Sequence, residues 1–61
     1  MPLVTTPNLA DHDGFYEELL GAMRGLDAEQ LAAFQAQLIL ILANHVGDAA
    51  ALREAIKLAR D

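Results

Sequence analysis

The stretch QLAAFQAQLILILANHVG, residues 30–47, decides the fold of this chain. It contains no Asp, Glu, Lys or Arg, and residues 38–43 are apolar without a break. A short apolar run fits either a buried strand or a helix, so its flanks must decide between the two. The flanking Ala, Leu and Gln residues are good helix formers, and no Gly or Pro occurs between Asp27 and Gly47. The sequence therefore predicts a central helix over residues 28–46.

Both ends of this helix have suitable capping residues. Asp27 is a favoured N-cap residue, and Gln30 follows it at the spacing of a capping box. Glu29 lies in the first turn, where the helix dipole favours an anion. Gly47 suits the left-handed conformation that commonly follows the last helical residue. These signals support the helix over the strand.

The central helix is apolar on more sides than a surface helix needs. At about 100° per residue, roughly two-thirds of its circumference is apolar, whereas an ordinary surface helix needs a stripe of about 100°. Two short neighbouring helices are too small to cover so much apolar surface. We therefore expect part of this helix to lie in an interface with another chain. The residues expected there are Leu38, Ile39, Ile41, Leu42 and Val46, with Ile41 the strongest candidate.

Two shorter helices are predicted on either side. Residues 12–24 follow Asp11, a favoured N-cap residue, and end before Gly25; residues 49–60 follow Asp48, another N-cap candidate. Because the connections are short, we expect the first two helices to lie antiparallel as neighbours. The predicted fold is all-α. It is a compact three-helix bundle forming a single domain over residues 11–61, with an extended N-terminal arm over residues 1–10 that contains Pro2 and Pro7.

Composition also points to a partner. A domain of this size buries only about 60% of the surface that its unfolded chain exposes, yet 54% of the 61 residues are hydrophobic. The chain has no cysteine for disulfides or thiolate metal sites, and its two histidines are a poor basis for a metal site. The remaining way to stabilise so small a domain is to bury its apolar surface against a copy of the chain or against another protein.

Charge and hydropathy argue against several other classes. The net charge of −5 disfavours binding to nucleic acids and to anionic membrane surfaces. The longest apolar run is far shorter than the roughly 20 residues that span a bilayer. The N-terminal sequence lacks the basic start and apolar core of a secretory signal, so we expect a cytoplasmic protein.

The sequence offers little catalytic chemistry. Asp11, His12 and Asp13 resemble a metal-binding or proton-transfer cluster, but they lie at a predicted helix start, where Asp is favoured for capping. The chain has no serine and no glycine-rich phosphate loop. We therefore expect no enzymatic activity, no cofactor and no bound metal.

Asn44 and His45 are the second polar candidates, next to the apolar run. A histidine in the last turn of a helix interacts favourably with the helix dipole, and a polar residue at a buried seam often fixes register. We expect a structural role or a contact with a partner. The alternative is a ligand carrier or small enzyme built from several copies, with Asn44 and His45 lining a shared pocket. A third reading is a regulator that docks through Tyr16, Glu17 and Glu18.

Two segments carry a resemblance to a known family. PNLADHDGFY (residues 7–16) and LILILANHVGD (residues 38–48) resemble a family of very short bacterial proteins catalogued as a domain of unknown function. The resemblance covers about residues 8–60 and transfers no functional residues. It implies genes near flavin-dependent aromatic hydroxylases, and hence an accessory subunit of such an enzyme.

The expected function is that of a non-catalytic, small helical interaction or accessory protein. It self-associates, or docks on a larger enzyme such as a flavin-dependent hydroxylase, through the apolar central helix.

Overall fold

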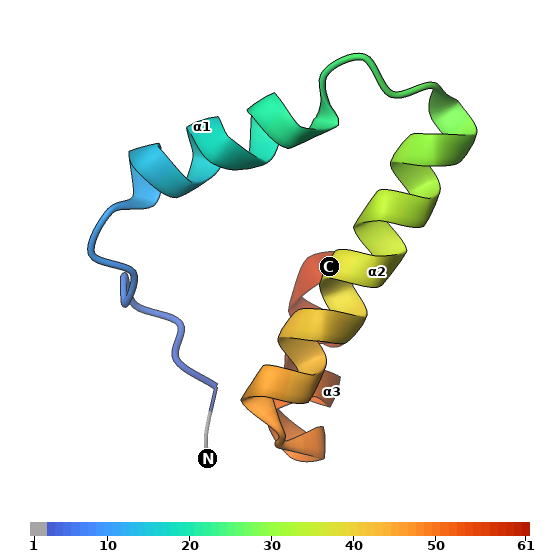
Figure 1. Ribbon diagram of the computed structural model, residues 1–61. Helices are drawn as coiled ribbons and strands as arrows, with labels where there is room; N and C mark the ends of the chain where they lie inside the picture. The colour runs from blue at the N-terminus through green and yellow to red at the C-terminus, as the bar shows by residue number, and fades with distance from the viewer. Residues whose placement is uncertain (1–2) are drawn as a thin grey trace.

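The computed structural model describes residues 3–61, which form three helices and no strand. The helices are α1 (His12–Met23), α2 (Ala28–Val46) and α3 (Ala49–Arg60) (Figure 1). The prediction of an all-α fold with a long central helix is confirmed. The expected ranges differ from these bounds only at the end of α1, by one residue.

Each helix begins at an aspartate that satisfies otherwise unpaired backbone N–H groups. The Gly14 N–H donates to Oδ1 of Asp11 at 3.0 Å at the start of α1. At the start of α3, Oδ1 of Asp48 accepts from the N–H groups of Ala50 and Ala51. The first four N–H groups of a helix have no partner within it, so these side chains fix where the helices start.

The start of α2 is a complete capping box. The Gln30 N–H donates to Oδ1 of Asp27 at 2.8 Å, and the Asp27 N–H donates to Oε1 of Gln30 at 3.2 Å. Both interactions follow from the spacing of these two residues. The predicted N-terminus of the central helix is therefore confirmed at atomic detail.

A tight turn at Gly47 joins α2 to α3. Gly47 has a left-handed φ of 68°, and its N–H donates to the Ala43 carbonyl oxygen at 3.0 Å. Asp48 follows immediately as the N-cap of α3. The chain therefore reverses within two residues, and α3 folds back beside the C-terminal half of α2 (Figure 1).

The connection between α1 and α2 does not produce the antiparallel pair expected from its length. Arg24 ends α1 in an extended conformation, and Gly25 has a φ of 79°. The chain turns there by less than a full reversal, so α1 leaves α2 at a wide angle (Figure 1). One polar contact joins the two helices near the turn: Nε2 of Gln35 lies 3.8 Å from Sδ of Met23.

The arrangement is open, which corrects the expectation of compact packing. Its Cα radius of gyration is 13.1 Å, whereas a compact chain of this length has about 10.5 Å. Among residues 3–61 only Ala51, beside the α2–α3 turn, is fully buried, with 4% exposure. A compact bundle requires each helix to bring one apolar face to a common centre. The apolar residues of α2 spread around several sides, so α1 and α3 contact different parts of it.

The partly covered side of α2 carries Leu31, Phe34 and Leu38, which are half-buried and recur at helical spacing. On α1, Leu19 and Met23 are likewise half-buried. The arm over residues 3–9 has neither helix nor strand and leads through a turn at residues 10–11 into α1. Residues 1 and 2 of the expected arm, including Pro2, lie outside the described residues.

Candidate interaction surface

The main hollow of functional interest is an apolar groove between α2 and α3. It has a volume of about 390 Å³ and an almost entirely apolar lining. We call this feature the α2–α3 groove. Its walls are Ile39, Leu42, Ala43 and Val46 on α2, and Leu52, Ala55 and Ile56 on α3.

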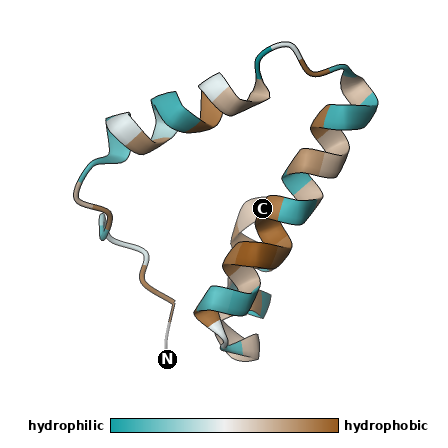
Figure 2. Cartoon of the chain, viewed as in Figure 1, coloured by the Kyte–Doolittle hydropathy of each residue, from teal (hydrophilic) through white to brown (hydrophobic). Residues whose placement is uncertain are grey.

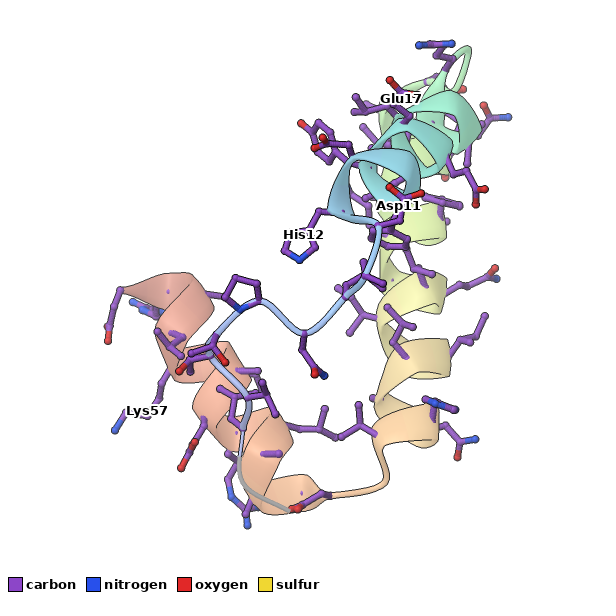
Figure 3. The ribbon with its side chains drawn as sticks, turned by 90° about the vertical axis from the view of Figure 1, so that its left-hand side faces the viewer. Asp11, His12, Glu17 and Lys57 are labelled. Atoms are coloured by element: carbon purple, nitrogen blue, oxygen red, sulfur yellow. The ribbon has the colours of Figure 1, made fainter. Side chains whose placement is uncertain are left out.

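The groove opens with distance from the turn. The two helices diverge from Gly47 and Asp48 (Figure 3). Exposure on the α2 wall rises along this direction, from 37% at Val46 to 65% at Ile39. On the α3 wall, Leu52 near the turn is half-buried, whereas Ile56, one turn further on, is 68% exposed. The chain therefore covers the narrow end of the groove and leaves the wide end open.

The structure brings together some of the residues expected in an interface and separates others. Ile39, Leu42 and Val46 line the α2–α3 groove. Leu38 is half-buried on the neighbouring side of α2, and Ile41 is 64% exposed outside the groove. The expectation that the short helices leave part of α2 uncovered agrees with these exposures. At about 100° per residue, Leu38, Leu42, Val46 and Ile39 fall within one side of α2, and Ile41 lies beyond Leu38, away from the groove.

Sequence reasoning missed two features of the exposed apolar surface. It did not place Leu52, Ala55 and Ile56 of the last helix in an interface. The signal was available, because these residues and the apolar side of α2 face each other across a turn of two residues. Leu40, which is 70% exposed on another side of α2 and does not line the groove, was also not predicted to contact a partner.

The hydropathy of the chain is concentrated in the same region. Figure 2 shows the most hydrophobic part of the ribbon in the middle of α2, with hydrophilic residues towards the α3 turn. Soluble monomers rarely leave a large contiguous apolar patch in water, and such patches usually mark an interaction site. In residues 3–61 no helix has the length and apolarity that a bilayer span requires.

Asn44 and His45 are exposed on α2 near its C-terminal end, and neither lines the α2–α3 groove. At about 100° per residue, Asn44 falls opposite the groove walls, whereas His45 falls beside Leu38 on the adjoining apolar side of α2. The two residues therefore lie on different sides of the helix. A contact through Asn44 would involve the side of α2 away from the groove.

A second hollow lies between the N-terminal arm and α1. Its volume is about 650 Å³, and residues 4–9 line it together with His12, Asp13, Phe15 and Tyr16. The imidazole of His12 projects from the start of α1 (Figure 3). Asp11 is occupied as an N-cap. In the part of the chain that the structure describes, no three His, Asp or Glu side chains are placed to hold a metal ion together.

The family relationship rests on almost the whole chain. Residues 3–61 match the family described as a protein of unknown function, DUF2783. The chain belongs to this DUF2783 family. Neither the curated proteins nor the solved structures contain a significant match to the chain. Family membership confirms the resemblance seen in residues 7–16 and 38–48, and it brings no assigned activity with it.

Proposed function

We propose that this DUF2783 protein is a non-catalytic helical interaction protein of the cytoplasm. It binds another protein chain, either a further copy of itself or a larger enzyme to which it is an accessory subunit. The α2–α3 groove and the adjoining apolar side of α2 form the binding surface. The observation that carries this proposal is the exposure of large apolar side chains on both walls of one groove.

The amount of exposed surface supports this proposal. The chain has an accessible surface of 5454 Å², whereas a compact monomer of 6.6 kDa has roughly 3,900 Å². The excess of about 1,600 Å² per chain is larger than the roughly 800 Å² that each partner contributes to a standard interface. Removing apolar area from water is favourable by about 25 cal/mol per Å², so burying the exposed apolar side chains of this surface in an interface favours association.

The test combines the size of the purified protein with its partners in the native host. Light scattering across micromolar concentrations measures self-association, and affinity purification from the host followed by mass spectrometry measures binding to other proteins. Both are repeated with an Ile39→Ser/Ile56→Ser variant, which makes both groove walls polar. The proposal requires that wild-type protein self-associates or captures a defined protein, and that the variant loses this property. Wild-type protein that stays monomeric and captures the same proteins as the variant excludes the proposal.

A further inference from the structure

The occupant of the α2–α3 groove can be inferred from the remaining helix. A groove between two diverging helices has room for a third helix, and α1 lies away from this groove in the single chain (Figure 1). We propose that α1 of a second copy fills the α2–α3 groove, and that the first copy returns the same contact. This inference rests on the proposed function and names its partner: another copy of this chain, bound by reciprocal exchange of α1.

The apolar face of α1 has the composition that the groove requires. Phe15, Leu19 and Met23 recur every four residues, and Tyr16 and Leu20 lie beside them, so one face of α1 is apolar over its full length. Phe15, Tyr16 and Leu20 are exposed in the single chain. The groove offers an equally apolar surface of comparable length along α2 and α3. The apolar face of α1 and the α2–α3 groove each expose apolar side chains that the other surface can bury.

The geometry of a single chain keeps these two surfaces apart. α1 runs away from the groove because the chain turns by less than a full reversal at Arg24 and Gly25 (Figure 1). In Figures 1 and 3 alike, α1 and α3 lie on separate parts of the molecule. The four-residue connection, residues 24–27, holds α1 near the N-terminal end of α2, whereas the groove lies towards its C-terminal end. A second copy supplies α1 to the groove without opening this connection.

Charge favours the same pairing. At about 100° per residue, Arg53 and Arg60 lie within about 60° of Ile56 on α3, and both are exposed. Lys57 lies further round and projects away from the rest of the chain (Figure 3). On α1, Glu17 and Glu18 flank the apolar face. Two copies of a chain with a net charge of −5 repel each other overall, but an acidic α1 beside a basic α3 opposes this repulsion where the surfaces meet.

The exposed area is sufficient for a stable dimer. The excess of about 1,600 Å² per chain, which includes polar surface and the N-terminal arm, exceeds the roughly 800 Å² that each partner contributes to a standard interface. The exchange is reciprocal, so both grooves are filled and the assembly closes at two chains. A heterologous contact would leave one groove of every pair open.

Charge reversal with complementation tests this inference. One variant carries Glu17→Lys and Glu18→Lys, and the other carries Arg53→Glu and Arg60→Glu. Each variant alone places like charges at both α1–α3 contacts, so we expect its dimer dissociation constant to rise by about tenfold or more. In an equimolar mixture, the basic α1 of one variant meets the acidic α3 of the other, and the acidic α1 meets the basic α3. We therefore expect the mixture to form a heterodimer of near wild-type affinity.

The other outcomes overturn the inference in distinguishable ways. If wild-type protein remains monomeric at about 100 µM, a second copy is excluded as the occupant. The proposed function then depends on whether affinity purification from the native host captures another protein. Variants that dimerise as well as wild type place the dimer contact elsewhere. A third outcome is that all four substitutions in one chain restore the behaviour of the wild type, but mixing the two double variants does not. This outcome would show that α1 fills the groove of its own chain.

A second measurement does not depend on charge. Because the chain has no cysteine, single cysteines report on contacts between copies. A Phe15→Cys chain mixed with an Ile56→Cys chain should form the mixed disulfide faster than when mixed with a Leu58→Cys chain, whose cysteine lies on the other side of α3. Equal rates for the two pairs exclude the docking of α1 in the groove. Circular dichroism confirms that each variant retains its helices.

Discussion

Ile39 and Ile56 line opposite walls of the α2–α3 groove, and each leaves about two-thirds of its side chain in water, 65% and 68% respectively. They come from helices joined by a turn of two residues, yet the divergence of these helices prevents either side chain from covering the other. Burying one such side chain completely stabilises a protein or complex by about 1.5–3 kcal/mol. We therefore expect the burial of Ile39 and Ile56 to contribute more to the free energy of association than the burial of other residues of the groove.

Replacing Ile56 tests the contribution of the α3 wall. Ile56→Ser changes an exposed residue, and Ile and Ser have similar helix propensities, so we expect the helix content to change little. Association buries Ile56, so we expect the dissociation constant to rise at least about tenfold. Sedimentation equilibrium measures this change. Leu58→Ser is the matched control, because Leu58 is 58% exposed on the same helix outside the groove. Equal effects of both substitutions would contradict a role for the groove.

Replacing Asp27 tests the local signal that starts the central helix. Asp27→Ala removes the Oδ1 atom that accepts from the Gln30 N–H, whereas the backbone N–H of residue 27 can still donate to Oε1 of Gln30. We expect a loss of about 0.5–2 kcal/mol in the free energy of unfolding. Thermal unfolding followed by circular dichroism, at one fixed protein concentration, measures it. Asp27→Asn keeps an acceptor oxygen and should lose much less.

Short-range chemistry of this kind could be predicted from the sequence. Asp11, Asp27 and Asp48 cap the helices as expected, and Gly47 adopts the left-handed conformation expected of it. These features depend on residues within about four positions of one another. Family membership was likewise recognisable from residues 7–16 and 38–48.

The relative placement of the helices could not be predicted in the same way. A short connection was expected to make α1 and α2 antiparallel, but the path through Arg24 and Gly25 depends on backbone angles that the length of the connection does not determine. Which of the expected interface residues would line a groove with α3 could not be predicted either. Ile39 lines the groove because α3 folds back along that side, whereas the expectation that Ile41 lies in an interface stays a prediction.

Two glycines of α1 should respond differently to alanine. A Cβ at Gly21 meets no atom within 4 Å, so Gly21→Ala should raise the free energy of unfolding by about 0.5–1 kcal/mol. A Cβ at Gly14 would collide with the Asp11 carboxylate, which accepts from the Gly14 N–H. Gly14→Ala therefore loses the cap while it gains helix propensity, and the two effects nearly cancel. Urea unfolding should separate the variants by roughly 1 kcal/mol, with Gly21→Ala the more stable. Equal stability of the two variants would show that the Asp11 cap contributes little.

Ile39 and Ile41 provide the sharpest comparison on α2. The two residues have the same side chain and nearly equal exposure, 65% and 64%, but only Ile39 lines the α2–α3 groove. If α1 of a second copy fills the groove, Ile39→Ser should raise the dimer dissociation constant at least about tenfold, whereas Ile41→Ser should leave it within about twofold, as for a surface substitution that removes no buried contact. Sedimentation equilibrium of both variants against wild type measures the difference. A larger effect at Ile41 would move the self-association surface to the outer side of α2. An effect of Ile41→Ser on binding to a larger enzyme alone would instead assign that outer side to a second partner, because it remains exposed when the groove is filled.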